Sequence, residues 1–232
     1  MRSGFILILL LASFPALAQQ NTPLETRPVQ AKPPTSGPIL PAPAIAPVPV
    51  ETPQILTEKI NRALNGMTQL VGDFNQINAD GRRRAGKLYI LRPGKLRFDY
   101  SPPSQLEVVS DGTSVAVIDK RVPQQDIYGI NQTPLKFLVG EKIDIAKDTK
   151  LISVRREKDE VILDIEDKNT IAGTSKIRIH FAGDTFQIRR WTVTDPQGIP
   201  TTVQLANLST QQRPDRNLFS INYQFNASRP NN

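Results

Sequence analysis

Few residues of this chain are of the types that carry out covalent or metal-ion chemistry. Its 232 residues include one histidine and no cysteine. Neither a Cys–His nucleophile nor a site with several histidine ligands can therefore be assembled. The histidine, His180, shares one side of an alternating pattern with Lys176 and Arg178. This pattern predicts that it faces solvent on a strand, and we expect no catalytic or ligand role for it.

Carboxylates are the other candidates for catalysis. Asp164, Glu166 and Asp167 lie close together, next to a predicted turn. Their spacing does not match a calcium-binding loop, so we expect a solvated turn. A pair of carboxylates that meets only in the fold, as in a glycosidase, stays an alternative. The sequence contains no nucleophile elbow, phosphate-binding loop or dinucleotide-binding fingerprint, and we predict neither enzymatic activity nor a cofactor.

A single arginine interrupts the apolar pattern of YILRPGKLRFDY, residues 89–100. Leu88, Ile90 and Arg92 share one side of a predicted strand, which breaks at Pro93-Gly94. Burying a guanidinium among core residues is costly unless other groups accept its hydrogen bonds. Either the strand ends there and Arg92 reaches solvent, or acceptors from another part of the chain receive it.

The first 18 residues are typical of a secretory signal. Arg2 supplies the positive charge, Phe5–Ala12 the apolar run and Ala16–Ala18 a small-x-small cleavage site. The apolar run is shorter than the roughly 20 residues of a membrane span. We therefore expect residues 1–18 to be a signal peptide and the mature chain to be exported and soluble. Because no cysteine follows the signal, we expect no lipid anchor.

Residues 19–53 form a proline-rich segment that includes KPPTSGPILPAPAIAPVPVETP. It has almost no charge and neither a helical nor a strand period. Such a composition favours extended polyproline II and buries too little surface to fold, so we expect a disordered linker. A partner-binding PxxP element, and with it a structural or interaction role, is the alternative.

The formal net charge is +7, and a positive net charge is common among nucleic-acid-binding proteins. Export argues against nucleic acid as a partner, and the Lys and Arg residues are scattered rather than gathered among aromatic residues. The one run of three, Arg82–Arg84, falls where a hairpin turn is expected. We expect a solvated turn; attraction to an anionic membrane surface or to an acidic partner is the alternative.

Two segments carry helix signals. Thr52 is a candidate N-cap for a long helix over residues 53–70, whose apolar residues recur at helical spacing. A short helix is predicted over residues 134–140, with Thr133 as its N-cap and Gly140 at its end. This short helix either fills space at one end of a sheet or acts as a movable lid.

From Gly72 onward the pattern mostly alternates with a period of two, and turn residues such as Asp111-Gly112 separate the runs. Tight turns between successive strands imply an antiparallel meander. About a dozen such strands in one domain curl into a barrel or a half-barrel. The candidate strands are residues 72–79, 86–92, 95–100, 105–110, 113–119, 122–128, 149–156, 160–166, 175–182, 186–194, 200–208 and 218–225.

Several of these segments resemble the family of periplasmic outer-membrane lipoprotein carrier proteins, LolA. The resemblance is carried by GKLYILRPGKLRFDY (86–100) followed by LEVVSDGTSVAVID (106–119). It is completed by ALNGMTQLVGDFNQ (63–76), TPLKFLVG (133–140) and RRWTVTDPQGIPTTVQLANL (189–208). It implies a mainly β domain over residues 54–232, an unclosed antiparallel half-barrel of about 11–12 strands. A long N-terminal helix and a short lid helix would cover its open side.

The resemblance also implies roles for individual residues. Arg92 falls on the arginine that, in the family, hydrogen-bonds from the sheet to the lid and holds the empty form closed. Leu135 and Leu138 fall on lid positions over an apolar cavity. The other implied cavity and helix positions are Ile60, Leu64, Met67, Leu70, Phe74, Ile90, Leu96 and Phe98.

In that family the cavity accepts acyl chains of lipoproteins that an ABC transporter releases from the inner membrane, and a receptor at the outer membrane takes them over. The resemblance thus implies a monomeric periplasmic chaperone with lipoprotein cargo and these two partners. Leu96 and Ala116 stand where some members have aromatic residues, so the cavity size stays open. A carrier or sensor of another lipid, such as a glycolipid, on the same fold is the alternative.

Overall fold

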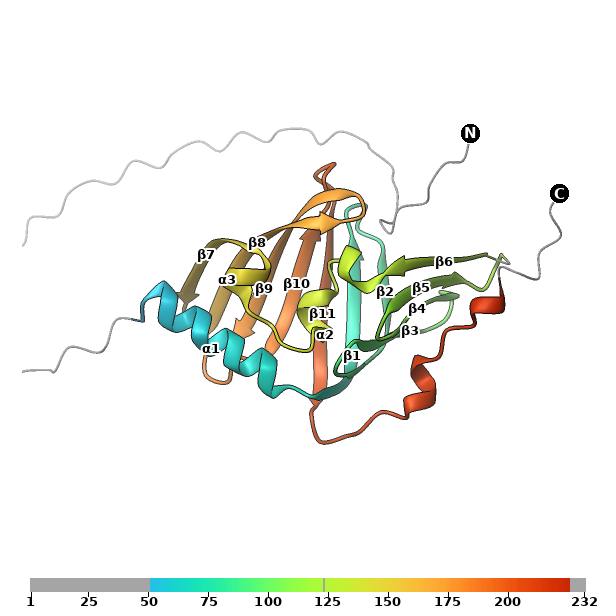
Figure 1. Ribbon diagram of the computed structural model, residues 1–232, viewed down its shortest axis with the longest axis horizontal. Coiled ribbons are helices and arrows are strands. Elements are labelled where there is room, and N and C mark those ends of the chain that lie inside the picture. Colours follow the sequence, from blue (N-terminus) through green and yellow to red (C-terminus); the bar gives the residue numbers. More distant parts are fainter. Residues whose placement is uncertain (1–50, 123, 226–232) are drawn as a thin grey trace, which may run out of the picture.

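The computed structural model describes residues 51–122 and 124–225 (Figure 1). The expected signal peptide, residues 1–18, and residues 19–50 of the expected linker lie outside the described residues. The last residues of that linker belong to the folded part, because Thr52 caps the first helix and Pro53 is its first residue. In the described part of the chain, no helix is long and apolar enough to span a membrane.

Eleven antiparallel strands form one sheet, in the order β6-β5-β4-β3-β2-β1-β11-β10-β9-β8-β7. Most neighbours in the sheet are also neighbours in the sequence, and the pairing of β1 with β11 joins the two halves. The edge strands β6 and β7 each pair on one side, so the sheet is unclosed, as predicted. The strands are β1 (Gln69–Asn78), β2 (Arg83–Leu91), β3 (Lys95–Tyr100), β4 (Leu106–Asp111), β5 (Ser114–Asp119), β6 (Gln124–Gly129), β7 (Lys150–Glu157), β8 (Glu160–Thr170), β9 (Gly173–Ala182), β10 (Ile188–Thr194) and β11 (Pro200–Ser209).

Short helices and one long helix cover one face of this sheet (Figure 1). The long helix α1 contacts the edge strand β7 and the short helix α3, which also packs on β7. The covering elements are α1 (Pro53–Gly66), the 3₁₀ turn η1 (Ile130–Gln132), α2 (Lys136–Val139) and α3 (Ile145–Asp148). The mainly β fold with a long N-terminal helix and a short second helix is therefore confirmed.

The prediction that the first helix runs to Leu70 was wrong at its C-terminal end. The helix ends at Gly66, Met67 is extended, and β1 begins at Gln69. Leu70 and Phe74 are buried, but they lie on the inner side of β1 rather than on a helix. The error arises because Leu64, Met67 and Leu70 continue a spacing of three, while Leu70 and Phe74 also fit the period of two.

The predicted N-cap of the short helix was also wrong. Thr133 does not cap α2: its hydroxyl donates to the Ile130 carbonyl 2.8 Å away, and Leu135 holds the N-cap position. The stop at Gly140 is correct, since its backbone N–H donates to the Lys136 carbonyl at 2.9 Å.

The predicted twelfth strand, residues 218–225, is also absent from the described part of the chain. Two 3₁₀ turns, η2 (Arg216–Phe219) and η3 (Tyr223–Phe225), stand in its place. The Asp215 carboxylate accepts from the backbone N–H of Asn217 at 2.9 Å, which starts the first turn. Phe219 is buried, and η2 contacts β3 and β4. Side-chain capping and one apolar anchor thus override the strand-like alternation of this segment.

The core lies between the covering helices and the inner face of the sheet. Trp191 of β10 is buried there, with its ring 6.0 Å from the ring of Phe137 in α2 and 6.4 Å from that of Phe98 in β3. Edge-to-face packing of this kind adds to the free energy gained by burying the rings. The short helix α2 is therefore in direct contact with the sheet.

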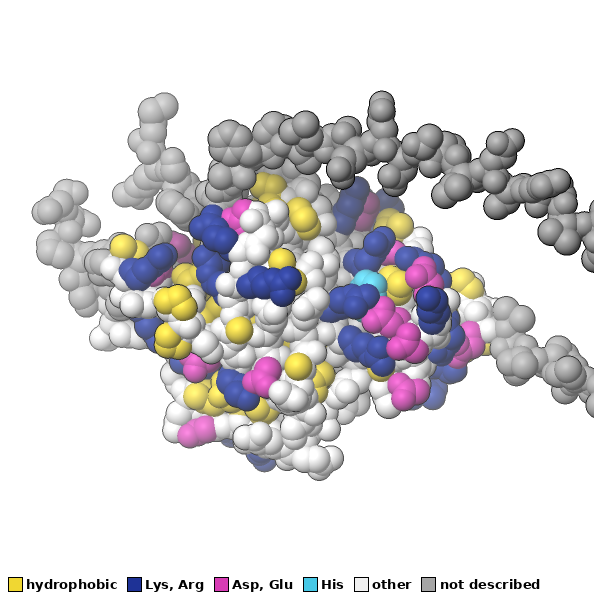
Figure 2. Space-filling model, turned by 180° about the vertical axis from the view of Figure 1, so that it is seen from behind, with side chains coloured by type: hydrophobic (Ala, Val, Ile, Leu, Met, Phe, Trp, Pro, Cys, Tyr) yellow, Lys and Arg dark blue, Asp and Glu magenta, His cyan; other side chains and the backbone are white. Residues whose placement is uncertain are grey.

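The outer face of the sheet carries charged side chains of both signs (Figure 2). His180 lies there, as the alternation predicts, but it is half-buried because it contacts Glu160 and Arg190, each at 2.8 Å. Asp164, on the same face, pairs with Arg155 and Arg178. In the described residues, no group of three or more His, Asp or Glu side chains is arranged to hold a metal ion.

The two turn motifs of the sequence, Arg-Pro-Gly and Ser-Asp-Gly, touch each other. Gly94 has φ 76°, and a Cβ built on it would lie 2.5 Å from the Cα of Gly112. The hydroxyl of Ser110 donates to the Gly94 carbonyl at 2.7 Å. Glycine is therefore required at position 94 by both its backbone conformation and its neighbour.

We predict that Gly94→Ala lowers the free energy of unfolding by about 2–4 kcal/mol, because left-handed strain and steric overlap add together. Gly81→Ala is the matched control: Gly81 has φ 77°, but a Cβ there would meet nothing within 4 Å. Strain alone should cost about 1–2 kcal/mol at that position. Urea unfolding of both variants measures the difference, and equal losses would contradict the argument from the Gly112 contact.

Candidate functional site: an arginine that joins two helix ends to the sheet

Arg92 follows β2 directly, and its guanidinium is bound to the ends of two helices. Its Nε donates to the carbonyl of Gly140 at 3.0 Å, and Nη2 donates to the same oxygen. Its Nη1 donates to the Leu64 carbonyl and, at 3.3 Å, to that of Met67. Gly140 is the C-cap of α2, whereas Leu64 and Met67 lie at the end of α1. One side chain therefore joins both covering helices to the sheet.

The last carbonyls of a helix have no partner within the helix and carry partial negative charge. A guanidinium at this position satisfies them and interacts favourably with both helix ends. Burial lowers the pKa of Arg92 from its usual value. A guanidinium nevertheless keeps its charge in proteins. The backbone next to Arg92 adds a further link, because the N–H of Gly94 donates to the Val139 carbonyl at 2.8 Å.

The apolar residues predicted as cavity and lid positions lie together, but as a packed core. Met67 packs against this core and is partly buried. None of these positions lines the open pocket beside the core, and neither does Arg92. The predicted positions within the buried cluster are Ile60, Leu64, Leu70, Phe74, Ile90, Leu96, Phe98, Leu135 and Leu138.

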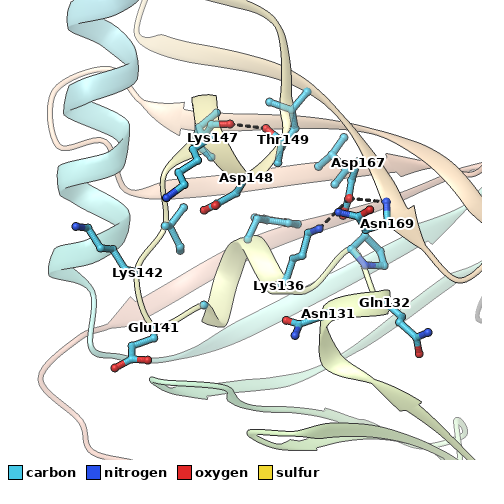
Figure 3. A pocket seen from close by; sticks show the side chains of 17 residues that line it. Asn131, Gln132, Lys136, Glu141, Lys142, Lys147, Asp148, Thr149, Asp167 and Asn169 are labelled. Atoms are coloured by element: carbon cyan, nitrogen blue, oxygen red, sulfur yellow. Dashed lines mark hydrogen bonds and ion pairs between the residues drawn. The ribbon is translucent and has the colours of Figure 1, made fainter.

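An open pocket of about 830 Å³ lies beside this core (Figure 3). Its walls come from the segment that contains α2 and α3 and from residues of β8 and β9. Lys136, Lys142 and Lys147 stand around it, whereas Ile165 and Ile177 supply part of its apolar lining. The pocket thus combines an apolar wall with charged groups.

The prediction that Asp164, Glu166 and Asp167 lie in a solvated turn was wrong. All three belong to β8, and Asp167 is buried with 1% of its side chain exposed. It follows Leu163 and Ile165 on the inner side of the strand. Lys136 of α2 donates to its Oδ1 at 2.8 Å (Figure 3). A polar residue at an inward position of the alternating pattern was the signal that could have identified it.

Two asparagines of α1 link that helix to the segment between α2 and α3, and sequence reasoning missed them. The side-chain amide of Asn65 donates to the Ile143 carbonyl at 2.7 Å and accepts from the Ile143 N–H at 2.8 Å. Asn61 accepts from the N–H of Ile145 at 3.1 Å. These contacts couple the covering elements to one another.

Ion pairs around Glu51 hold the start of α1 to the sheet. Glu51 forms ion pairs with Lys59 of α1 and with Arg156 of β7. The hydrogen bond from Arg156, followed by that from Lys59, lowers the pKa of Glu51 from 4.5 to about 2. Both cations also lie within 6 Å of the ring centroid of Phe186.

We predict that Asn65→Ala loosens the segment between α2 and α3 without unfolding the sheet. The Ile143 N–H loses its side-chain acceptor and should exchange with solvent about tenfold faster. Hydrogen exchange measured by NMR or mass spectrometry tests this, with Arg62→Ala, an exposed residue of the same helix, as the control. An unchanged exchange rate at Ile143 would show that Asn65 does not couple these elements.

We predict that the Glu51 ion pairs stabilise the fold at neutral pH and fail in acid. The pKa of Glu51 is lower in the folded state than its ordinary 4.5, so its contribution is complete above about pH 4.5 and is lost as the pH falls toward 2. Urea unfolding should show wild type more stable than Glu51→Gln at pH 6. The difference should narrow steadily below pH 4.5; a constant difference between pH 6 and pH 3 would refute this role.

Comparison of the sequence with known proteins identifies a family. The family profile described as "Outer membrane lipoprotein carrier protein LolA" matches residues 65–222, more than half of the chain. An outer-membrane lipoprotein carrier protein of Methylococcus capsulatus is 28% identical over 179 residues, which is 73% of this chain and 83% of that protein. The protein of the same name from Legionella pneumophila strain Lens is 23% identical over 177 residues, 73% of this chain and 86% of that protein.

Solved structures also match over most of the described residues. A LolA superfamily protein from Nitrosomonas europaea aligns at a TM-score of 0.40 with 11% identity, covering 72% of this chain and 99% of that one. Because this TM-score is below 0.5, the family assignment rests on the sequence matches. The profile match over residues 65–222 shows that this chain belongs to the LolA family of outer-membrane lipoprotein carrier proteins.

Proposed function

We propose that this protein is a periplasmic carrier that binds the acyl chains of lipoproteins released from the inner membrane and delivers them to the outer membrane. The observation that carries the proposal is the placement of Arg92, which joins α1 and α2 to the sheet over an apolar core. Family membership supports the general role. In this proposal the described structure is the closed form.

Cargo binding then requires the covering helices to move. Leu135 and Leu138 of the α2 region are buried in the core, so acyl chains reach the part of the inner face beneath them only by displacing them. Opening breaks the Arg92 hydrogen bonds, and hydrogen bonds to a charged group contribute about 1.5–3 kcal/mol each. The closed form therefore offsets part of the free energy that cargo binding releases.

Such an offset is useful for a carrier that must release its cargo. Burying one CH₂ group contributes about 0.8 kcal/mol, so a chain of about 16 carbons yields about 13 kcal/mol. Several fully buried chains would exceed the practical ceiling of about 18–21 kcal/mol for non-covalent affinity. A cover that tends to close keeps the net affinity within a range that permits handover.

The proposal includes export by residues 1–18, a monomeric carrier, and no catalytic role. Its partners are an inner-membrane ABC transporter that releases lipoproteins and an outer-membrane receptor that accepts them. The residues that meet the cargo are the predicted core and lid positions, which already lie side by side in the buried cluster.

A carrier of another lipid would use the same sheet and cover. Native mass spectrometry of the protein isolated from the cell envelope separates the two functions by the mass of the bound lipid. Incubation with spheroplasts is the direct functional test: the proposed carrier should release lipoproteins into the soluble fraction, whereas a carrier of another lipid should leave them in the membrane.

We predict that Arg92→Leu weakens the closed state, so that lipoprotein loading is kept or strengthened while transfer to outer-membrane vesicles falls at least tenfold. The reason is that the variant loses the contacts to the carbonyls of Leu64, Met67 and Gly140. Arg83→Leu, at an exposed arginine at the start of β2, is the control for the lost charge. Normal transfer by Arg92→Leu would contradict the proposed role of Arg92 in holding the closed state.

A further inference from the structure

The inner face of the sheet changes from apolar to polar between two neighbouring rows of β8, β9 and β10. The strand register places Ile165, Ile177 and Val193 in one row. In the next row, Asp167 pairs with Ser175. Thr194, the last residue of β10, pairs with Lys176. Asp195 comes next and therefore lies opposite Ser175, on the side away from Asp167. We call Asp167, Ser175 and Asp195 the polar row.

Both carboxylates of the polar row are buried, and each has an oxygen without a partner. Asp167 Oδ1 accepts from Lys136 and from the backbone N–H of Asn169, but its Oδ2 has no hydrogen-bond partner among the described residues. Asp195 Oδ1 accepts from the N–H of Ile199 at 2.7 Å, and its Oδ2 is likewise unpaired in the described structure. Buried acceptors of this kind are costly unless a donor reaches them.

The polar row lies next to space that a ligand can enter. Asp167 lines the 830 Å³ pocket together with Ile165 and Ile177 of the apolar row. Ser175 and Asp195 line a smaller adjoining pocket of about 50 Å³, and the two pockets share Gln132 and Pro134. A chain lying along the strands would therefore have its apolar part on the isoleucines and its polar end at the carboxylates.

The negative charge of the polar row determines which kind of polar group on a ligand can bind there. Asp167 and Asp195 contribute two negative charges, and Lys136 is the one cation that an ion pair brings to them in the described residues. An anionic head group would add like charge, whereas an N–H donor would satisfy the unpaired oxygens. An ester group offers acceptors alone, while a secondary amide offers one N–H.

We propose that Asp167 and Asp195 form an acceptor site for N–H groups at the polar end of the cargo cavity, and that this site favours acyl chains joined through an amide over those joined through an ester. The inference rests on the proposed carriage of acyl chains and names the linkage that the cavity recognises. Lys136 covers Asp167 in the closed form and leaves with α2 when the cover opens, so the cargo N–H takes the place of the lysine.

The test compares two probes with the same tail, N-methylpalmitamide and methyl palmitate, which differ in one N–H. Their binding to the full-length protein is followed by the fluorescence of Trp191, whose ring packs against Phe137 of α2. Wild type should bind the amide about tenfold more tightly than the ester, as expected for one hydrogen bond to a charged group. Asp167→Leu and Asp195→Asn should each reduce this ratio several-fold.

Asp164→Asn is the matched control, because Asp164 lies on the same strand but pairs with Arg155 and Arg178 on the outer face. It should keep the wild-type ratio. Asp167→Asn, which preserves volume, replaces Asp167→Leu if thermal unfolding shows that the latter does not fold. Equal affinity of wild type for the two probes would overturn the acceptor site and leave acyl-chain carriage standing. Failure of both probes to bind would overturn both.

Discussion

One guanidinium joins both covering helices of this molecule to its sheet. Carbonyl groups at the C-terminal ends of α1 and α2 both accept from Arg92, and the residue itself is fixed at the end of β2. Without such a donor the helix ends would leave carbonyls unsatisfied above the apolar face of an unclosed sheet. In the proposed function, this interaction determines where the covering helices sit and whether the apolar face is accessible.

The remaining polar contacts of the cover act at other places. Glu51 ties the start of α1 to β7, Asn65 joins α1 to the segment between the short helices, and Lys136 ties α2 to Asp167. Apolar packing fills the space between them. Because polar contacts can be exchanged for contacts with water or cargo, the proposed opening of the cover has a moderate cost in free energy.

The fold class followed from the alternating pattern and the turn residues, which specify an antiparallel meander. Arg92 could also be singled out, since a charge in an apolar register needs acceptors. The C-terminal end of α1 could not be predicted, because Leu70 fits both a helical spacing and the alternation of a strand. The strand forms because this segment pairs with β2 and β11. Asp167 was wrongly placed in a turn and Asn65 was missed, because their partners lie on elements distant in sequence.

The most direct test of the account is a crystal structure of the protein bound to a triacylated lipopeptide. The account predicts that the bonds from Arg92 to Gly140 and Leu64 are broken, and that Leu135 and Leu138 have left the core to make room for acyl chains. A complex with acyl chains on the inner face and all of these contacts intact would contradict it.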